Sequence, residues 1–261
     1  MKKIIKPIAV KLMDYIPGIV GLYQFFLGII LVPSFYVEYK KFFSSSKKTK
    51  TRFTLYKRDF FLCLFDKTAK TPFDPHYTYH PAWAARVVAR NNPKKHIDIS
   101  STLKFGTIVS AFIPVEFYDY RPAELKLSNL KSKQGDLLKL PFSDNSIESL
   151  SCMHTIEHIG LGRYGEPIDY DGDIKAMKEL SRSLALGGTL IFVTPVGKPR
   201  IQFNAHRIYS YEQILEYFKD LKLTEFSLIP DDYKKYGLIE NAEPSMVENQ
   251  SYGCGCFVFT K

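Results

Sequence analysis

The stretch "HIDISSTLKFG", residues 96–106, is followed by "VEFYD", residues 115–119, and this pair decides the predicted fold. Each begins with a short apolar run that is typical of a buried strand, and each strand ends close to an aspartate. Asp98 and Asp119 stand about twenty residues apart, the separation at which an acidic side chain meets a ribose hydroxyl in nucleotide-binding folds. We therefore expect both at one sheet edge, gripping a nucleotide. The alternative, that Asp98 caps a helix and Asp119 begins a turn, stays open.

The remaining chain continues this alternation of strands and helices. Helical periodicity is found at 80–91, where Pro81 suits a first turn, at 173–188, where a glycine pair suits a helix stop, and at 210–218. The last of these opens with Ser210 and Gln213 in capping-box spacing. Further strands are expected at 146–153, 189–195, 224–229 and 256–261. The pattern predicts an α/β fold, a doubly wound and mostly parallel sheet with an antiparallel edge strand at the C-terminus.

The order of these pieces over residues 80–261 resembles class I S-adenosylmethionine-dependent methyltransferases. The matching stretches are "HIDIS", "VEFYD", "GDLLKLPFSDNSIESLSCMHTIEHI" and "LALGGTLIFVTPVG". The resemblance implies a seven-stranded Rossmann-like sheet and S-adenosyl-L-methionine as cofactor. It also implies cofactor-binding roles for Asp98 at the first turn, for Asp119 at the ribose and for Asp136 with Leu137 near the adenine.

One turn departs from the family pattern. The family has D-x-G-x-G-x-G where this chain has "DISSTLKFG", so Ser100 and Ser101 occupy the close-approach positions and only Gly106 remains. Serine hydroxyls could bond the amino-acid end of the cofactor, whereas a Cβ at a tight turn could close the site. Two hypotheses follow: an enzyme that binds its cofactor through Ser100 and Ser101, or a catalytically inactive scaffold with the same fold.

The stretch "SCMHTIEHIGLGRYG", residues 151–165, supplies candidate catalytic groups. In the family this segment faces the reacting methyl, which places His154 beside the cofactor and Glu157 and His158 near the acceptor. Methyl transfer to a hydroxyl needs a proton acceptor, and a histidine that titrates near neutrality suits that role. His158 and His206 are therefore the candidate bases. The alternative for each is a structural histidine.

A possible acceptor site follows from neighbouring polar residues. Arg163, Tyr164, Asn204 and Arg207 could bind an anionic or sugar-like acceptor, although the arginines could instead form surface ion pairs and Tyr164 could fill the core. "EHIGLGRYG" and "FNAHR" also resemble a methyltransferase-like family linked with surface-glycan synthesis. That resemblance implies a small hydroxyl-bearing acceptor of the glycan-precursor type.

His154, Glu157 and His158 also form the H-x-x-E-H pattern of one zinc peptidase class. A zinc hydrolase would need both histidines on one helical face and a third ligand, such as His206 or Glu240. Because the preceding residues are predicted to be a strand, His154 falls at a strand end and the pair would not share a regular face. We therefore expect no metal.

Charge and cysteine content limit the other functions. Residues 1–58 hold twelve Lys and Arg against only Asp14 and Glu38, so the net charge of +9 resides in this segment and residues 59–261 are nearly neutral. This argues against nucleic-acid binding by the folded domain. The four cysteines are too few and too scattered for a disulfide framework, which favours a reduced, cytosol-facing protein. We expect a basic, apolar arm at 1–58 and a methyltransferase-like domain at 59–261.

The arm contains an uncharged run, Ile16 to Val37, of about the length that crosses a bilayer. Pro17, Pro33 and the glycines also allow an interfacial hairpin or helix, or a hairpin buried in protein. If the run spans, the more basic flank, residues 40–58, keeps the domain in the cytoplasm, attached to the inner face of the membrane.

Overall fold

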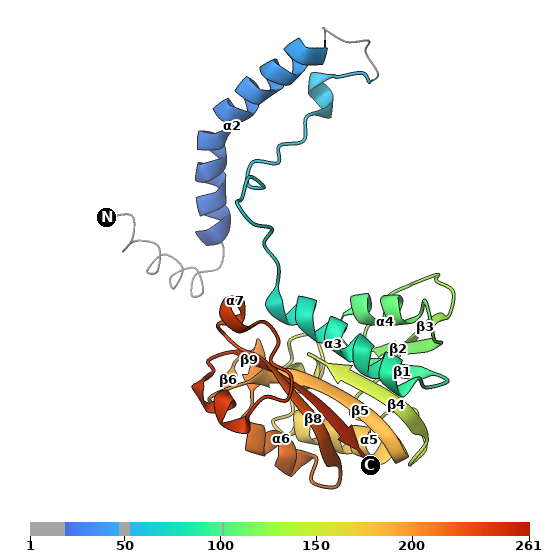
Figure 1. Cartoon of the computed structure of the whole chain (residues 1–261). Helices are drawn as coiled ribbons and strands as arrows, with labels where there is room; N and C mark the ends of the chain where they lie inside the picture. The colour runs from blue at the N-terminus through green and yellow to red at the C-terminus, as the bar shows by residue number, and fades with distance from the viewer. Residues whose placement is uncertain (1–18, 47–52, 101) are drawn as a thin grey trace. The chain divides into compact units, whose positions relative to one another are not determined.

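The computed structural model describes residues 19–46, 53–100 and 102–261. Its contacts divide the chain into two compact units, Met1–Pro72 and Phe73–Lys261, whereas the sequence places the boundary after residue 58. The strands drawn in Figure 1 all belong to the second unit.

The first unit contains one long apolar helix, α2, Ile19–Ser46, and a short 3-10 turn, η1, Lys57–Asp59. From Gly21 to Ser46 the helix is long and apolar enough to cross a membrane, with a mean hydropathy of 1.4 and 6% of its most apolar window buried. It continues through Pro33, so the hairpin alternatives are wrong for the described part of the run; residues 16–18 lie outside it. Glu38 forms an ion pair with Lys67 within this unit.

The second unit is built on a seven-stranded sheet in the order β3-β2-β1-β4-β5-β9-β8. The strands are β1 His96–Ile99, β2 Val115–Asp119, β3 Leu130–Gln134, β4 Ile147–Met153, β5 Leu184–Val196, β8 Lys222–Ile229 and β9 Gly253–Thr260. Only β9 runs against its neighbours. The doubly wound, mostly parallel fold is thus confirmed. The C-terminal strand is not an edge strand, because β9 inserts between β5 and β8, and β8 forms the edge.

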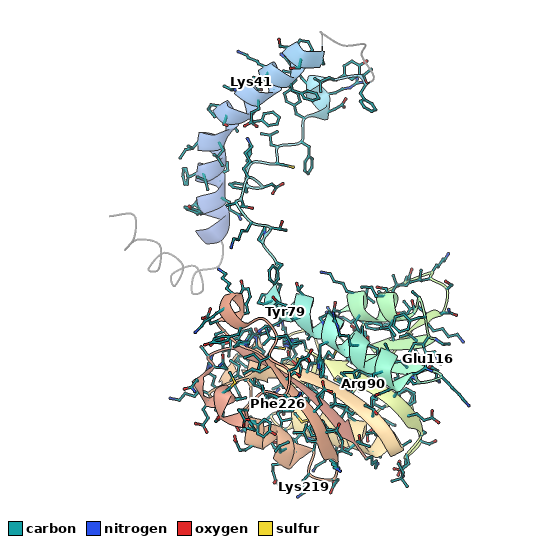
Figure 2. All side chains as sticks on the ribbon, in the orientation of Figure 1. Lys41, Tyr79, Arg90, Glu116, Lys219 and Phe226 are labelled. Atoms are coloured by element: carbon teal, nitrogen blue, oxygen red, sulfur yellow. The ribbon has the colours of Figure 1, made fainter. Side chains whose placement is uncertain are left out.

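Helices cover both faces of the sheet (Figure 1). The four longer helices of this unit are α3 Pro75–Asn91, α4 Leu103–Val109, α5 Gly172–Ser183 and α6 Tyr211–Tyr217. One apolar core joins α3 and α4 to the sheet, and the other joins α5 and α6 to the opposite face. Figure 2 labels Arg90 of α3, which pairs with Glu225 of β8 at 2.7 Å.

The remaining elements of this unit are short. They are the hairpin of β6 Arg200–Gln202 and β7 His206–Ile208, the turns η2 Ile156–His158 and η3 Pro244–Asn249, and α7 Tyr233–Tyr236.

Two predicted helix boundaries are wrong. Helix α3 begins at Pro75, because the Asp74 side chain accepts a hydrogen bond from the Tyr77 N–H at 3.0 Å, and Pro81 lies inside the helix. Helix α5 ends at Ser183, and the glycine pair at 187–188 belongs to β5. There the register between β4 and β5 shifts and Gly187 has φ +74°, so the glycines form an irregularity in the strand and not a helix stop. The capping box of Ser210 and Gln213 is confirmed.

Candidate functional site

A cavity of about 360 Å³ lies at the carboxyl ends of β1, β2, β3 and β4. Because these strands are parallel, the segments that follow them meet at one edge of the sheet. Six residues singled out from the sequence line the cavity: Ser100, Asp119, Asp136, Leu137, His158 and Tyr164. The volume falls within the range of small-molecule sites.

Two carboxylates stand on neighbouring strand ends. Asp119 is half-buried, and its Oδ1 accepts a hydrogen bond from the Arg121 N–H at 2.7 Å. Asp136 is exposed, and its Oδ1 accepts from the Leu138 N–H at 2.9 Å. In each case a hydrogen bond to Oδ1 within the local turn fixes the carboxylate, and Oδ2 takes no part in that bond. These groups suit the hydroxyl and amino donors of a nucleoside.

Gly135, between β3 and Asp136, shapes the cavity in a way that the sequence did not reveal. A Cβ at this position would lie 3.0 Å from Cβ and Cδ1 of Tyr118, closer than side chains normally pack. The glycine therefore lets the chain cross directly over Tyr118, and both residues line the cavity.

Asp98 does not line the cavity, contrary to the expectation that it grips the ligand with Asp119. It is fully buried, and its Oδ1 accepts hydrogen bonds from Ser100 Oγ at 2.7 Å and Ser151 Oγ at 2.6 Å. Burial raises the pKa of Asp98 to about 7, although both hydroxyls oppose that shift. Asp98 thus acts beneath the site, by fixing Ser100, which does line it. Ser101 lies outside the described residues.

A buried polar chain continues from Asp98 across the sheet, which the sequence did not indicate. His96 bonds Ser151 Oγ through Nε2 at 2.9 Å and Ser149 Oγ through Nδ1 at 2.7 Å. Burial lowers the pKa of His96 to about 3, so the ring is neutral at physiological pH. The alternation of β1 explains this chain, since Ile97 belongs to the α5 and α6 core while His96 and Asp98 point to the other face.

His158 is the predicted base that reaches the cavity. Its Nδ1 lies 2.6 Å from the Ala205 carbonyl oxygen, and because a carbonyl only accepts, that nitrogen carries the hydrogen. Nε2 then keeps the lone pair, and it lies 3.8 Å from Glu157 Oε1. Glu157 is buried outside the cavity and could stabilise a protonated His158 without touching an acceptor.

His154 and His206 lie outside the cavity lining. His154 is buried, and its Nδ1 bonds Glu157 Oε1 at 2.8 Å. Burial acts to raise the pKa of Glu157, but the nearby His154, with its hydrogen bond, and His158 outweigh that effect, so the pKa lies below its ordinary value. His206 is half-buried, with its pKa lowered mainly by burial, and its ring lies 4.9 Å from that of Tyr252.

The four predicted acceptor-binding residues separate in space. Tyr164 lines the cavity, with the Arg121 guanidinium 4.6 Å from its ring centroid. Arg163 is exposed and donates to the Ala205 carbonyl at 2.9 Å, beside His158. Asn204 lies exposed between β6 and β7, outside the cavity lining.

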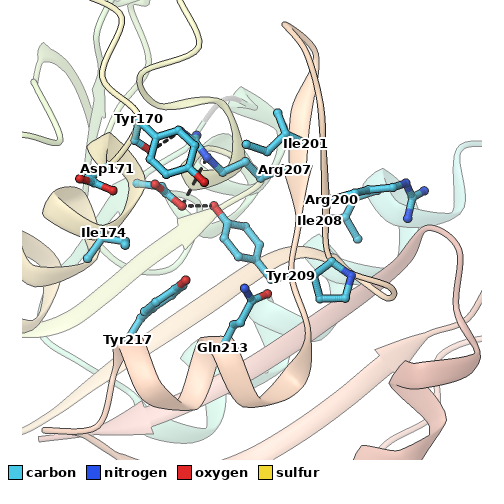
Figure 3. A pocket seen from close by; sticks show the side chains of 12 residues that line it. Tyr170, Asp171, Ile174, Arg200, Ile201, Arg207, Ile208, Tyr209, Gln213 and Tyr217 are labelled. Atoms are coloured by element: carbon cyan, nitrogen blue, oxygen red, sulfur yellow. Dashed lines mark hydrogen bonds and ion pairs between the residues drawn. The ribbon is translucent and has the colours of Figure 1, made fainter.

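Arg207 is not an acceptor-binding residue at this cavity. It is buried and donates to the carbonyls of Ile159 at 2.6 Å and Tyr170 at 3.0 Å, and it forms an ion pair with Asp173 at 3.5 Å. Figure 3 shows it beside Tyr209 in a separate cavity of about 240 Å³. Its contacts tie β7 to the loop before α5, which is a structural role.

The zinc peptidase arrangement of His154, Glu157 and His158 is not formed. His154 adopts a left-handed backbone with φ +50°, and only a 3-10 turn follows, so the two histidines do not share a helical face. His154 faces Cys254, with 3.4 Å between Nε2 and Sγ, whereas Nδ1 of His158 faces Ala205. The strand end expected at His154 is confirmed, since β4 stops at Met153.

The chain is similar to one protein family profile and to several solved structures. Residues 139–222 match the profile of a family described as a Caenorhabditis protein of unknown function, DUF268. No curated protein sequence matches the chain. Among solved structures, N-methyltransferase NodS from Bradyrhizobium japonicum, in complex with S-adenosyl-l-homocysteine, is 12% identical with a TM-score of 0.49, covering 71% of this chain and 87% of that one.

A second solved structure is a TehB-like SAM-dependent methyltransferase from Corynebacterium glutamicum, 17% identical with a TM-score of 0.46, covering 68% of this chain and 86% of that one. A third is the YcgJ protein from Bacillus subtilis, 14% identical with a TM-score of 0.46, covering 69% and 98%. At these identities the likeness concerns the fold, and nothing about the reaction follows from it.

Proposed function

We propose that this protein is an S-adenosylmethionine-dependent methyltransferase that acts on a small hydroxyl-bearing acceptor. The observation that carries the proposal is the cavity of about 360 Å³. It is lined both by Asp119, Asp136 and Leu137, at the ends of β2 and β3, and by His158, which follows β4. One cavity thus offers two carboxylates that suit a nucleoside and a histidine whose Nδ1 is held by the Ala205 carbonyl.

The residues present fit the cofactor. Asp119 would hold the ribose hydroxyls, Asp136 and Leu137 the adenine, and the Ser100 hydroxyl the amino-acid end. The cavity is open beside Ser100, which favours the cofactor-binding hypothesis over a turn closed by its side chains. When bound, the cofactor supplies a methyl group already activated by a sulfonium. The protein then contributes mainly positioning.

His158 would accept the proton of the acceptor hydroxyl at Nε2. Its Nδ1–H is held by the Ala205 carbonyl, so the ring is fixed in the tautomer that a base needs. Glu157, 3.8 Å from Nε2, would stabilise the positive charge that the ring gains. Tyr164 and Arg121 offer an aromatic face and a cation to the acceptor. His206 does not line the cavity, so we assign it no proton transfer.

The acceptor class and the location are proposed from the sequence and from helix α2. The glycan-precursor acceptor rests on the resemblance of "EHIGLGRYG" and "FNAHR". For location, helix α2 is apolar and exposed, and the basic residues concentrate in its C-terminal flank. We propose attachment through α2 to the cytoplasmic face of a membrane.

Calorimetric titration of the full chain in detergent with S-adenosylhomocysteine tests this function. Binding at micromolar concentration supports it. ATP and NAD serve as controls that share the adenosine part but not the amino-acid part, and we expect both to bind more weakly. Absence of S-adenosylhomocysteine binding at millimolar concentration would instead favour the catalytically inactive scaffold.

A further inference from the structure

A second group of reactive side chains lies at the same sheet edge as the cavity, on the side of α3. His76 of α3, His154 after β4 and Cys254 of β9 are all buried, and one ligand atom of each lies within 4.8 Å of the other two. Because β9 is antiparallel to β4 and β5, its beginning lies at the sheet edge where those two strands end, and this topology places Cys254 and His154 at the same edge.

We propose that His76, His154 and Cys254 bind a Zn²⁺ ion. One thiolate and two imidazoles suit this borderline-soft cation, and three protein ligands leave a fourth position for water or another ligand. Tetrahedral zinc with usual bond lengths places a nitrogen and a sulfur ligand about 3.6 Å apart. His154 Nε2 and Cys254 Sγ lie 3.4 Å apart, so this edge of the site is already formed.

His154 is oriented as a zinc-bound histidine usually is. It directs Nδ1 to Glu157 Oε1 at 2.8 Å and Nε2 to Cys254 Sγ at 3.4 Å. The ring of His76 stacks on that of Tyr252, with 5.1 Å between the centroids. An outer partner such as Glu157 holds the ring of a metal ligand and its tautomer. His154 keeps its position at φ +50°, a conformation that is unfavourable for a residue other than glycine.

Charge balance supplies an independent argument. Glu157 is buried, and its Oε2 has no hydrogen-bond partner among the described residues. A buried carboxylate needs nearby positive charge. A divalent cation beside the Cys254 thiolate and the Glu157 carboxylate would make the group neutral. A cavity of about 310 Å³ is lined in part by His76 and Tyr252, so one member of the group borders open space.

The test is elemental analysis of the full chain in detergent after dialysis, with Cys254→Ser as the variant and Cys152→Ser as the matched control. Both cysteines are completely buried in strands of the same sheet, but only Cys254 belongs to the group. We expect one equivalent of zinc in the wild type and in Cys152→Ser, and a loss of zinc in Cys254→Ser. The inference does not depend on the proposed cofactor, and S-adenosylhomocysteine titration of the same samples keeps the two questions separate.

A second measurement guards against a variant that fails to fold. Removal of the metal from the wild type by a chelator should lower Tm by about 5–10 °C relative to protein with free zinc at roughly 100 times Kd. Substitution of the wild type with Co²⁺ should give a thiolate-to-cobalt charge-transfer band. Two results would overturn the inference. One is wild-type protein that takes up no zinc. The other is a Cys254→Ser variant that still binds zinc and still shows the charge-transfer band with Co²⁺. The close contact of His154 and Cys254 would then be an ordinary buried S–H···N hydrogen bond.

Discussion

Asp119 offers the sharpest test of the nucleotide site. Its Oδ1 is engaged by the Arg121 N–H at 2.7 Å, and the carboxylate lines the cavity at the end of β2. A hydrogen bond to a charged group contributes about 1.5–3 kcal/mol, and each 1.4 kcal/mol changes an equilibrium constant tenfold. Asp119→Ala should therefore raise the Kd for S-adenosylhomocysteine by about 10- to 150-fold.

The assay is calorimetry on the full chain, with two companion variants. Asp119→Asn keeps the shape of the side chain and removes its charge, so its Kd for S-adenosylhomocysteine should lie between the values for the wild type and for Asp119→Ala. Asp144→Asn removes a carboxylate that is exposed and paired with Arg182, away from the cavity lining, and its Kd should equal that of the wild type. Equal affinity of the wild type and Asp119→Ala would remove the assignment of this cavity to a nucleoside.

Three further predictions concern the support of the site. Arg207→Met breaks a buried pair with Asp173 and should lower the free energy of unfolding in urea by about 3–5 kcal/mol, with cofactor affinity unchanged; lower affinity at unchanged stability would restore a binding role. Phe257→Ala empties a fully buried position in β9 and should cost about 3–5 kcal/mol in the same assay, and a loss below about 1 kcal/mol would contradict the packing. The pKa of Asp98 is raised to about 7, so its protonated form stabilises the fold below about pH 4, and this contribution is lost as the pH rises to 7. The free energy of unfolding of the wild type relative to Asp98→Asn should therefore fall by up to about 4 kcal/mol over that range. A difference that does not change with pH would refute the raised pKa.

The sequence predicted every strand of the seven-stranded sheet except β3, whose carboxyl end forms part of the cavity. β1, β2 and β4 have apolar runs that end at polar residues, and the structure confirms them. β3, "LKSKQ", was missed because only Leu130 is buried and the edge strand carries polar side chains. The stop of α5 was misplaced because a glycine pair ends a helix and marks a strand irregularity equally well.

Residues whose role depends on a second segment were harder to predict. The sequence offered Arg207 as an acceptor-binding residue or as a surface ion pair, but in the structure it is buried and contacts Asp173 and two carbonyls from other segments. His76 and His80, four residues apart on α3, were a visible signal of one helix face, yet nothing local indicates that His154 packs against them at ring distances of 5.3 and 5.0 Å. The family pattern placed Asp98 at the ligand, whereas the register of β1 buries it.

The backbone at His154 explains how one short segment serves two sites. In a regular turn the side chains that follow β4 would face the same region. With φ +50° at His154, that side chain faces α3 and Cys254, while His158, four residues later, faces the cavity. Glu157 lies between them, bonded to His154 at 2.8 Å and 3.8 Å from His158. A cation bound at His154 would therefore compete with His158 for the charge of Glu157, so zinc removal should change the rate of methyl transfer. If the two sites are independent, that rate will be the same with and without zinc.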